Sequence, residues 1–180
     1  LLRRASEKLW IDALTDPGVR MIVVIPSYKE DEWQLTLESL FAQKENNFQT
    51  EVIFLINYPK AQKDACEKFS YQQKKQVEQW MSEHQTRNLR FHCCPVFEMD
   101  SKHAGVGLAR KTGMDEAVRR FVSISNPDGV IVCLDADSTV HEHYLNHIHQ
   151  YFITHPSKDC LSIGFKHRIP EDDLLASAID

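Results

Sequence analysis

Two aspartates separated by one residue, Asp135 and Asp137, follow an apolar run and are the residues best suited to chemistry. The run, residues 129–134 (GVIVCL), has the composition of a buried strand, so both carboxylates stand at its carboxyl end. If the chain turns there, the pair can converge on a hard cation such as Mg²⁺ or Mn²⁺. Alternatively, one aspartate caps the following helix and the other is solvated. The spacing alone leaves both interpretations open.

The segments that must position this acid pair alternate between strand and helix patterns. Strands are predicted at residues 20–26, 51–56, 89–96, 129–134 and 160–165. Helices are predicted at residues 31–43, 61–84, 105–122 and 142–154, and a last one begins near residue 170. Unbroken apolar strands that alternate with helices predict an α/β domain whose mostly parallel sheet is covered on both faces. Ligands of such sheets bind at the carboxyl ends of the strands.

Size and charge narrow the function classes. The 180 residues fit one domain, and a net charge of −5 gives no support to a nucleic-acid partner held by phosphate contacts. No apolar run approaches the ~20 residues of a membrane helix, and the first ten residues lack a signal-peptide core. Five cysteines without a CxxC pair indicate free thiols in a reducing compartment. We therefore expect a cytoplasmic protein, and the absence of an initial Met suggests a fragment of a longer chain.

Three further segments accompany the acid pair in a definite order: residues 25–30 (IPSYKE), 36–43 (TLESLFAQ) and 107–113 (GLARKTG). This order resembles that of the family 2 glycosyltransferases. Their pattern is a strand ending in P-T/S-Y-N-E, then TL-x-SL and a Gln, then G-x-x-x-AR-N-x-G, and finally a strand ending in D-x-D. The resemblance covers about residues 20–150, and its specificity comes from the combination of the four parts.

The resemblance implies a fold and a reaction. The fold is GT-A, a Rossmann-like α/β/α sandwich with a mostly parallel central sheet, and residues 1–180 would form its donor-binding half as a single domain. The reaction is an inverting transfer of a sugar, of hexosyltransferase type, from a UDP- or GDP-sugar to an acceptor hydroxyl. A glycan or lipid-linked glycan is the implied acceptor, and membrane contact would be at most peripheral, through parts not present in this chain.

The resemblance also implies roles for individual residues. Pro26, Ser27, Tyr28 and Glu30 would surround the nucleobase and ribose, and Arg110 would lie near the donor phosphates. Asp135 would touch the ribose or the metal, and Asp137 would coordinate the Mn²⁺ or Mg²⁺ that bridges the pyrophosphate. The implied donor-binding set is Pro26, Ser27, Tyr28, Glu30, Asn57, Arg110, Asp135 and Ala136, and the implied metal ligands are Asp135 and Asp137.

The sequence departs from the family pattern in two places. The second strand ends in Asn57, Tyr58 and Pro59, where the family has two acids and a glycine. Asn57 can donate and accept hydrogen bonds and Tyr58 can stack, so these residues can still recognise a nucleobase. The sequence does not determine which nucleotide is bound. The general base of the family lies in a later segment. Here the acids 171–173 have the composition of a helix start, so we assign no catalytic base.

Three alternatives belong to other classes. A phosphatase of the haloacid dehalogenase type would use Asp135 as nucleophile and Asp137 as acid/base. That class normally carries the motif on its first strand, whereas three strands precede it here. The residues after Asp137 also leave little room for the lysine that the class needs later in the chain. A domain that only binds a nucleotide-sugar would need no catalytic base. A zinc site is suggested by His141, His143, His147 and His149, although the apolar residues of that segment form the other helix face and favour solvated histidines.

Overall fold

A computed structural model describes residues 10–44, 47–100, 102 and 104–166. The strands are β1 (Val19–Ser27), β2 (Gln49–Pro59), β3 (Leu89–Cys93), β4 (Phe97–Met99) and β5 (Val130–Cys133). The helices are α1 (Trp33–Phe41), α2 (Lys63–Glu83), α3 (Val106–Ser123) and α4 (Tyr144–Thr154), with the short 3-10 turn η2 (Lys60–Gln62) before α2. No helix of the described part is both long and apolar enough to cross a bilayer.

The strands form one parallel sheet in the order β3-β2-β1-β5, and β4 pairs with the end of β2. The chain adds β2 and β3 on one side of β1 and then returns to place β5 on the other side. The order therefore reverses at β1. In an open parallel sheet this switch point opens a crevice at the carboxyl ends of the two strands concerned. Here these ends belong to β1 and β5.

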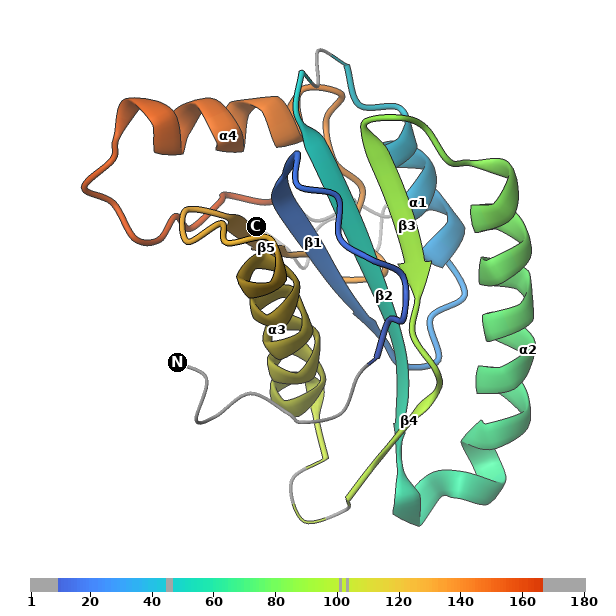
Figure 1. Cartoon of the computed structure of the whole chain (residues 1–180). Coiled ribbons are helices and arrows are strands. Elements are labelled where there is room, and N and C mark those ends of the chain that lie inside the picture. Colours follow the sequence, from blue (N-terminus) through green and yellow to red (C-terminus); the bar gives the residue numbers. More distant parts are fainter. Residues whose placement is uncertain (1–9, 45–46, 101, 103, 167–180) are drawn as a thin grey trace, which may run out of the picture.

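Helices cover both faces of the sheet, as Figure 1 shows. Alternate residues of β1 point to opposite faces: Met21 and Val23 join one buried cluster, and Ile22 and Val24 join the other. The first cluster receives side chains from α1, α2 and α4, and the second receives side chains from α3. This confirms the mostly parallel α/β sandwich expected from the sequence.

Two strand predictions need correction. Residues 159–166 have no regular structure and are exposed, so the strand predicted at 160–165 is absent. A strand needs a hydrogen-bonded neighbour, and no described strand pairs with this segment. The strand predicted at 89–96 ends earlier, at Cys93 in β3, and β4 begins only at Phe97, because Pro95 between them cannot donate to the ladder. The helix predicted from residue 170 lies outside the described residues.

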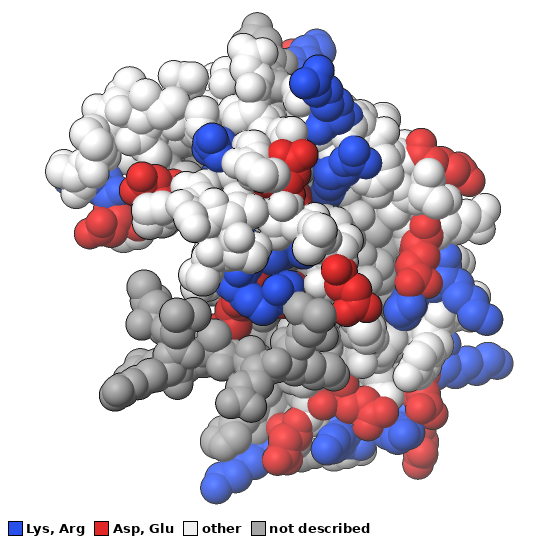
Figure 2. Space-filling view, in the orientation of Figure 1, with Lys and Arg blue, Asp and Glu red and all other residues white. Residues whose placement is uncertain are grey.

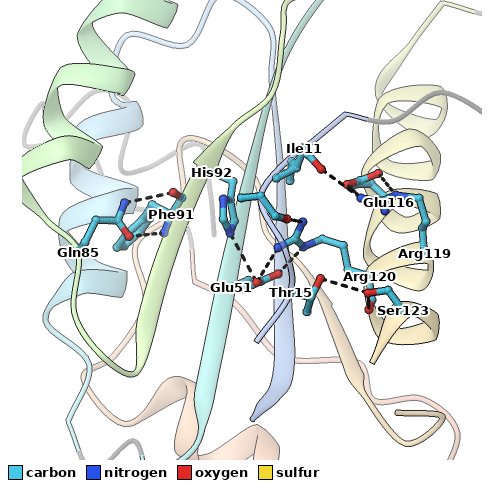
Figure 3. A network of polar contacts seen from close by, with 11 residues as sticks. Ile11, Thr15, Glu51, Gln85, Phe91, His92, Glu116, Arg119, Arg120 and Ser123 are labelled. Atoms are coloured by element: carbon cyan, nitrogen blue, oxygen red, sulfur yellow. Dashed lines mark hydrogen bonds and ion pairs between the residues drawn. The ribbon is translucent and has the colours of Figure 1, made fainter. Parts of the chain in front are cut away.

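Helix α3 packs closely on the sheet and also buries charge. A Cβ atom on Gly113 would lie 2.3 Å from a methyl carbon of Val24 in β1, so a glycine is needed where the helix crosses the strand. The apolar pattern predicts Met114 on the inner face, but Met114 is exposed and Glu116 and Arg120 are buried instead. Arg120 reaches Glu51 of β2 in the network of Figure 3. A hydrophobic pattern does not predict the burial of Glu116 and Arg120, because a charged side chain is buried only where another residue pairs with it.

Candidate donor-binding site

One cavity of about 460 Å³ opens at the carboxyl ends of β1, β2 and β5. Its wall contains every residue of the predicted donor and metal set except Ser27: Pro26, Tyr28, Glu30, Asn57, Arg110, Asp135, Ala136 and Asp137. These residues come from the ends of three strands and from the first turns of α3. The structure thus brings together positions that are more than 100 residues apart in the sequence. Their roles toward a ligand stay predictions.

The acid pair stands on a turn that begins where β5 ends. The amide of Leu134 donates to the carbonyl of Val24 at 3.0 Å, and the amide of Ser138 donates to the carbonyl of Asp135 at 3.2 Å. Ala136 is buried, whereas the two aspartates on either side of it are exposed and line the cavity. The chain therefore turns as convergence of the two carboxylates requires.

Positive groups also line the cavity. The N-terminal residues of α3 contribute Gly105, Val106 and Ala109, and this first turn carries no acidic residue. The free amides of a helix N-terminus favour anions. Arg110 makes an ion pair with Asp135. Its Nε is out of contact with solvent and has no acceptor among the described residues.

The amide of Asn57 has a fixed orientation. Its Nδ2 donates to the carbonyls of Ser27 at 3.0 Å and of Leu55 at 3.2 Å. Because carbonyl oxygens only accept, the nitrogen must face them, and both of its hydrogens are used. Asn57 can therefore contact a ligand only through its acceptor Oδ1. The sequence had allowed it to act as a donor as well.

Two residues near the site lie differently from expectation. Ser27 is fully buried beneath the cavity wall, where its hydroxyl donates to Oε1 of Gln73 at 3.3 Å. The amide of Gln73 donates in turn to the carbonyl of Glu30 at 2.6 Å, so Ser27 supports the wall without lining it. Tyr58 is also buried, and its hydroxyl donates to Glu98 at 3.0 Å. Burial raises the pKa of Tyr58 to about 12, and its ring is not available for stacking.

Sequence reasoning missed part of the wall. Gln62 of η2 lines the cavity and accepts a hydrogen bond from the hydroxyl of Tyr28, while Pro59 and Met99 add an apolar part. The contribution of Gln62 depends on the course of the chain after β2, and no local pattern at this residue indicates it. Met99 reaches the cavity only because β4 continues along β2.

Negative charge accumulates on the acidic side of the cavity. Burial raises the pKa of Glu30, and the neighbouring carboxylates of Asp137, Asp31 and Asp135 raise it further. Such repulsion is relieved when a cation binds. No group of three or more His, Cys, Asp or Glu side chains forms a metal site in the part of the chain that the structure describes. This holds for the histidines around α4, where His149 stacks on Phe48.

Comparisons with known proteins extend this description only at the level of the fold. No protein-family model and no curated protein matches the chain. Among solved structures, S. aureus TarS 1-349 is 18% identical with a TM-score of 0.48, over 77% of this chain and 33% of that one. The same TarS region in complex with UDP-GlcNAc is 17% identical, with a TM-score of 0.46, over 77% of this chain and 32% of that chain. The same region in complex with UDP is 18% identical, with a TM-score of 0.47, over 77% of this chain and 33% of that chain.

The chain thus spans about a third of the length of these structures. At these identities and TM-scores the likeness carries no argument about activity. The mostly parallel α/β sandwich rests on this chain's own sheet. The resemblance to the family 2 glycosyltransferases of the GT-A fold rests on the four sequence segments.

Proposed function

We propose that this chain is the donor-binding portion of an inverting glycosyltransferase. It would bind a nucleoside-diphosphate sugar with the help of a divalent cation and present the sugar to an acceptor hydroxyl. The observation that carries the proposal is that one cavity is lined by both kinds of charge: the carboxylates of Asp135 and Asp137, and Arg110 with the N-terminus of α3. A cation together with a diphosphate is the ligand chemistry that complements both.

The residues present fit a divalent cation bound jointly with a diphosphate. Mg²⁺ typically takes one or two carboxylates from the protein and fills its remaining positions with phosphate oxygens and water. Asp137 and Asp135 would hold the cation, and Mn²⁺ suits the same oxygen ligands. When bound, the cation neutralises charge on the departing diphosphate. Arg110 would donate hydrogen bonds to the same phosphate oxygens, because its side chain is partly exposed and lines the cavity.

The fixed acceptor at Asn57 would meet a donor group of the base. Uracil and guanine present a ring N–H on the edge used for base pairing, and cytosine and adenine present an exocyclic amine there. Because Oδ1 of Asn57 only accepts, it complements each of these groups and does not select one base. The UDP- and GDP-sugars stay candidate donors through the family resemblance alone.

No catalytic base is assigned. The acids at 171–173 lie outside the described residues, and an inverting transfer needs a group that removes the proton of the acceptor hydroxyl. The chain is therefore expected to bind its donor better than it transfers sugar. A domain that binds a nucleotide-sugar without completing the transfer is the second form of the proposal. The glycan or lipid-linked acceptor is implied by the family resemblance alone.

Calorimetric titration with UDP, GDP and CDP, each with and without Mn²⁺, tests the donor site. The expected result is Mn²⁺-dependent binding of UDP or GDP, and loss of that binding in Asp137→Ala. Asp159→Ala is the matched control, because Asp159 is exposed and lies outside the cavity. Absence of binding to all three nucleotides would overturn the proposal. Release of sugar from a bound donor then separates a transferase from a domain that only binds.

A further inference from the structure

Helix α1 places three polar side chains, Thr36, Ser39 and Gln43, along the turn that carries the acid pair. Thr36 and Ser39 lie within α1, and Gln43 follows its last turn. Their spacing brings them to one side of the helix. Thr36 is fully buried. A buried hydroxyl is costly unless it forms a hydrogen bond, so its partner indicates what the residue does.

The partner of Thr36 lies between the two aspartates. Its Oγ1 donates to the carbonyl of Ala136 at 2.8 Å. That carbonyl belongs to the peptide that joins Ala136 to Asp137, so the bond fixes the plane from which the Asp137 side chain departs. Ala136 is itself buried, and this leaves the carboxylates of Asp135 and Asp137 on the cavity side.

Ser39 and Gln43 hold the rest of the segment from 134 to 143, which we name the acid-pair loop. The amide of Val140 donates to Oγ of Ser39 at 3.1 Å. The side-chain amide of Gln43 donates to the carbonyl of His141 at 2.7 Å, and its Oε1 accepts from the amide of Leu145 at 3.0 Å. The latter bond satisfies an amide in the first turn of α4.

We propose that Thr36, Ser39 and Gln43 are positioning residues that hold the acid-pair loop in its cation-binding shape before the cation arrives. Two neighbouring carboxylates repel each other, and the loop belongs to neither a strand nor a helix between β5 and α4. Its backbone is therefore held largely by α1. This inference rests on the proposed function, and it explains in physical terms why the TL-x-SL and Gln segment accompanies the acid pair.

The first experiment compares Thr36→Val with Thr36→Ser by calorimetric titration of Mn²⁺ in the presence of UDP or GDP, whichever the wild-type chain binds. Thr36→Val keeps the shape but loses the donor, and we expect its Mn²⁺ affinity to fall about 10- to 100-fold, the usual effect of losing a supporting contact around a metal. Thr36→Ser restores the hydroxyl and should recover most of the affinity. Thr112→Val is the matched control, because Thr112 is equally buried in a helix and bonds only within α3.

The second experiment needs neither metal nor nucleotide. Amide hydrogen exchange should accelerate at Val140 in Ser39→Ala and at Leu145 in Gln43→Leu, while the amides of β1 keep their protection. If the wild-type chain binds no Mn²⁺, the proposed function fails, although the exchange result still shows whether α1 anchors the loop. If the wild-type chain binds Mn²⁺ and both Thr36→Val and Ser39→Ala bind it equally well, the positioning role is overturned.

Discussion

Two of the arginine–carboxylate pairs of helix α3 join it to other segments of the chain, and these two differ mainly in burial. Arg120 and Glu51 pair at the start of β2, where their side chains are 0% and 3% exposed. Arg110 and Asp135 pair at the mouth of the cavity, where they are 38% and 50% exposed. The residue types are nearly the same, and one helix carries both arginines. The surroundings therefore decide what each pair can do.

The buried pair is closed to a ligand because its side chains are almost fully buried. The guanidinium of Arg120 donates twice to Glu51, at 2.5 and 2.7 Å, and once to the carbonyl of Ala13 at 2.9 Å. His92 lies 3.6 Å from the same carboxylate. Figure 3 shows how this network joins β2, β3 and α3. By contrast, the side chains of Arg110 and Asp135 are both partly exposed and both line the cavity.

The comparison teaches that an exposed pair can exchange its partner and a buried pair cannot. Under the proposed function, a diphosphate would replace Asp135 at Arg110, and the cation would take the carboxylate that is released. Acidic and basic side chains are interspersed on the face shown in Figure 2, so charge alone does not single out a site there. The better guide to a binding site is whether a charged pair is exposed and can still form contacts with a ligand.

The largest expected effect is that of Arg120→Ala. Removing one member of a buried ion pair leaves the other charge without compensation, and we expect a loss of about 3–5 kcal/mol in the free energy of unfolding. Urea denaturation at neutral pH measures this loss. Arg110→Ala on the same helix is the control and should change stability by at most about 1 kcal/mol, because an exposed pair contributes little.

A double variant makes the same test sharper. Glu51→Leu with Arg120→Met replaces the pair by apolar side chains and should be more stable than Arg120→Ala. If the double variant is the less stable of the two, then the uncompensated charge of Glu51 is not what destabilises Arg120→Ala, and the contrast between the two pairs loses its basis.

The second effect concerns ligand binding. Arg110→Ala should weaken UDP or GDP binding by about 1.5–3 kcal/mol, the usual worth of a hydrogen bond to a charged group, while the fold stays intact. Arg110→Lys keeps the charge but loses the second donor and should recover only part of the affinity. Calorimetry gives the affinity and urea denaturation gives the stability. An equal loss of stability in Arg110→Ala and Arg120→Ala would contradict the inference that Arg110 serves ligand binding and Arg120 serves stability.

Sequence reasoning found the mouth of the cavity because two apolar strands end in recognisable residues, at Pro26 and at Asp135. It missed the buried pair because it assigned charged residues to the outer face of α3, and nothing near Arg120 in the sequence points to Glu51. It placed a strand at 160–165 because a short apolar segment shows composition but not whether a neighbouring strand exists. Local sequence patterns thus predicted where the site lies, but they could not predict contacts between residues that are far apart in the sequence.

The smallest expected effect is a dependence of stability on acid. Burial alone would raise the pKa of Glu51, but the hydrogen bonds from Arg120 and the nearby His92 outweigh it and lower the pKa below the ordinary value of 4.5. A carboxyl whose pKa is lowered in the folded state stabilises the fold above that ordinary value, and the contribution is lost as the pH falls toward the folded-state pKa. Urea denaturation of the wild-type chain between neutral pH and about pH 3 should therefore show a steeper loss of stability than the Glu51→Leu, Arg120→Met double variant, which lacks the titrating group. Parallel curves for the two proteins would mean that Glu51 titrates alike when folded and unfolded, and that the buried pair is less firmly held than its contacts indicate.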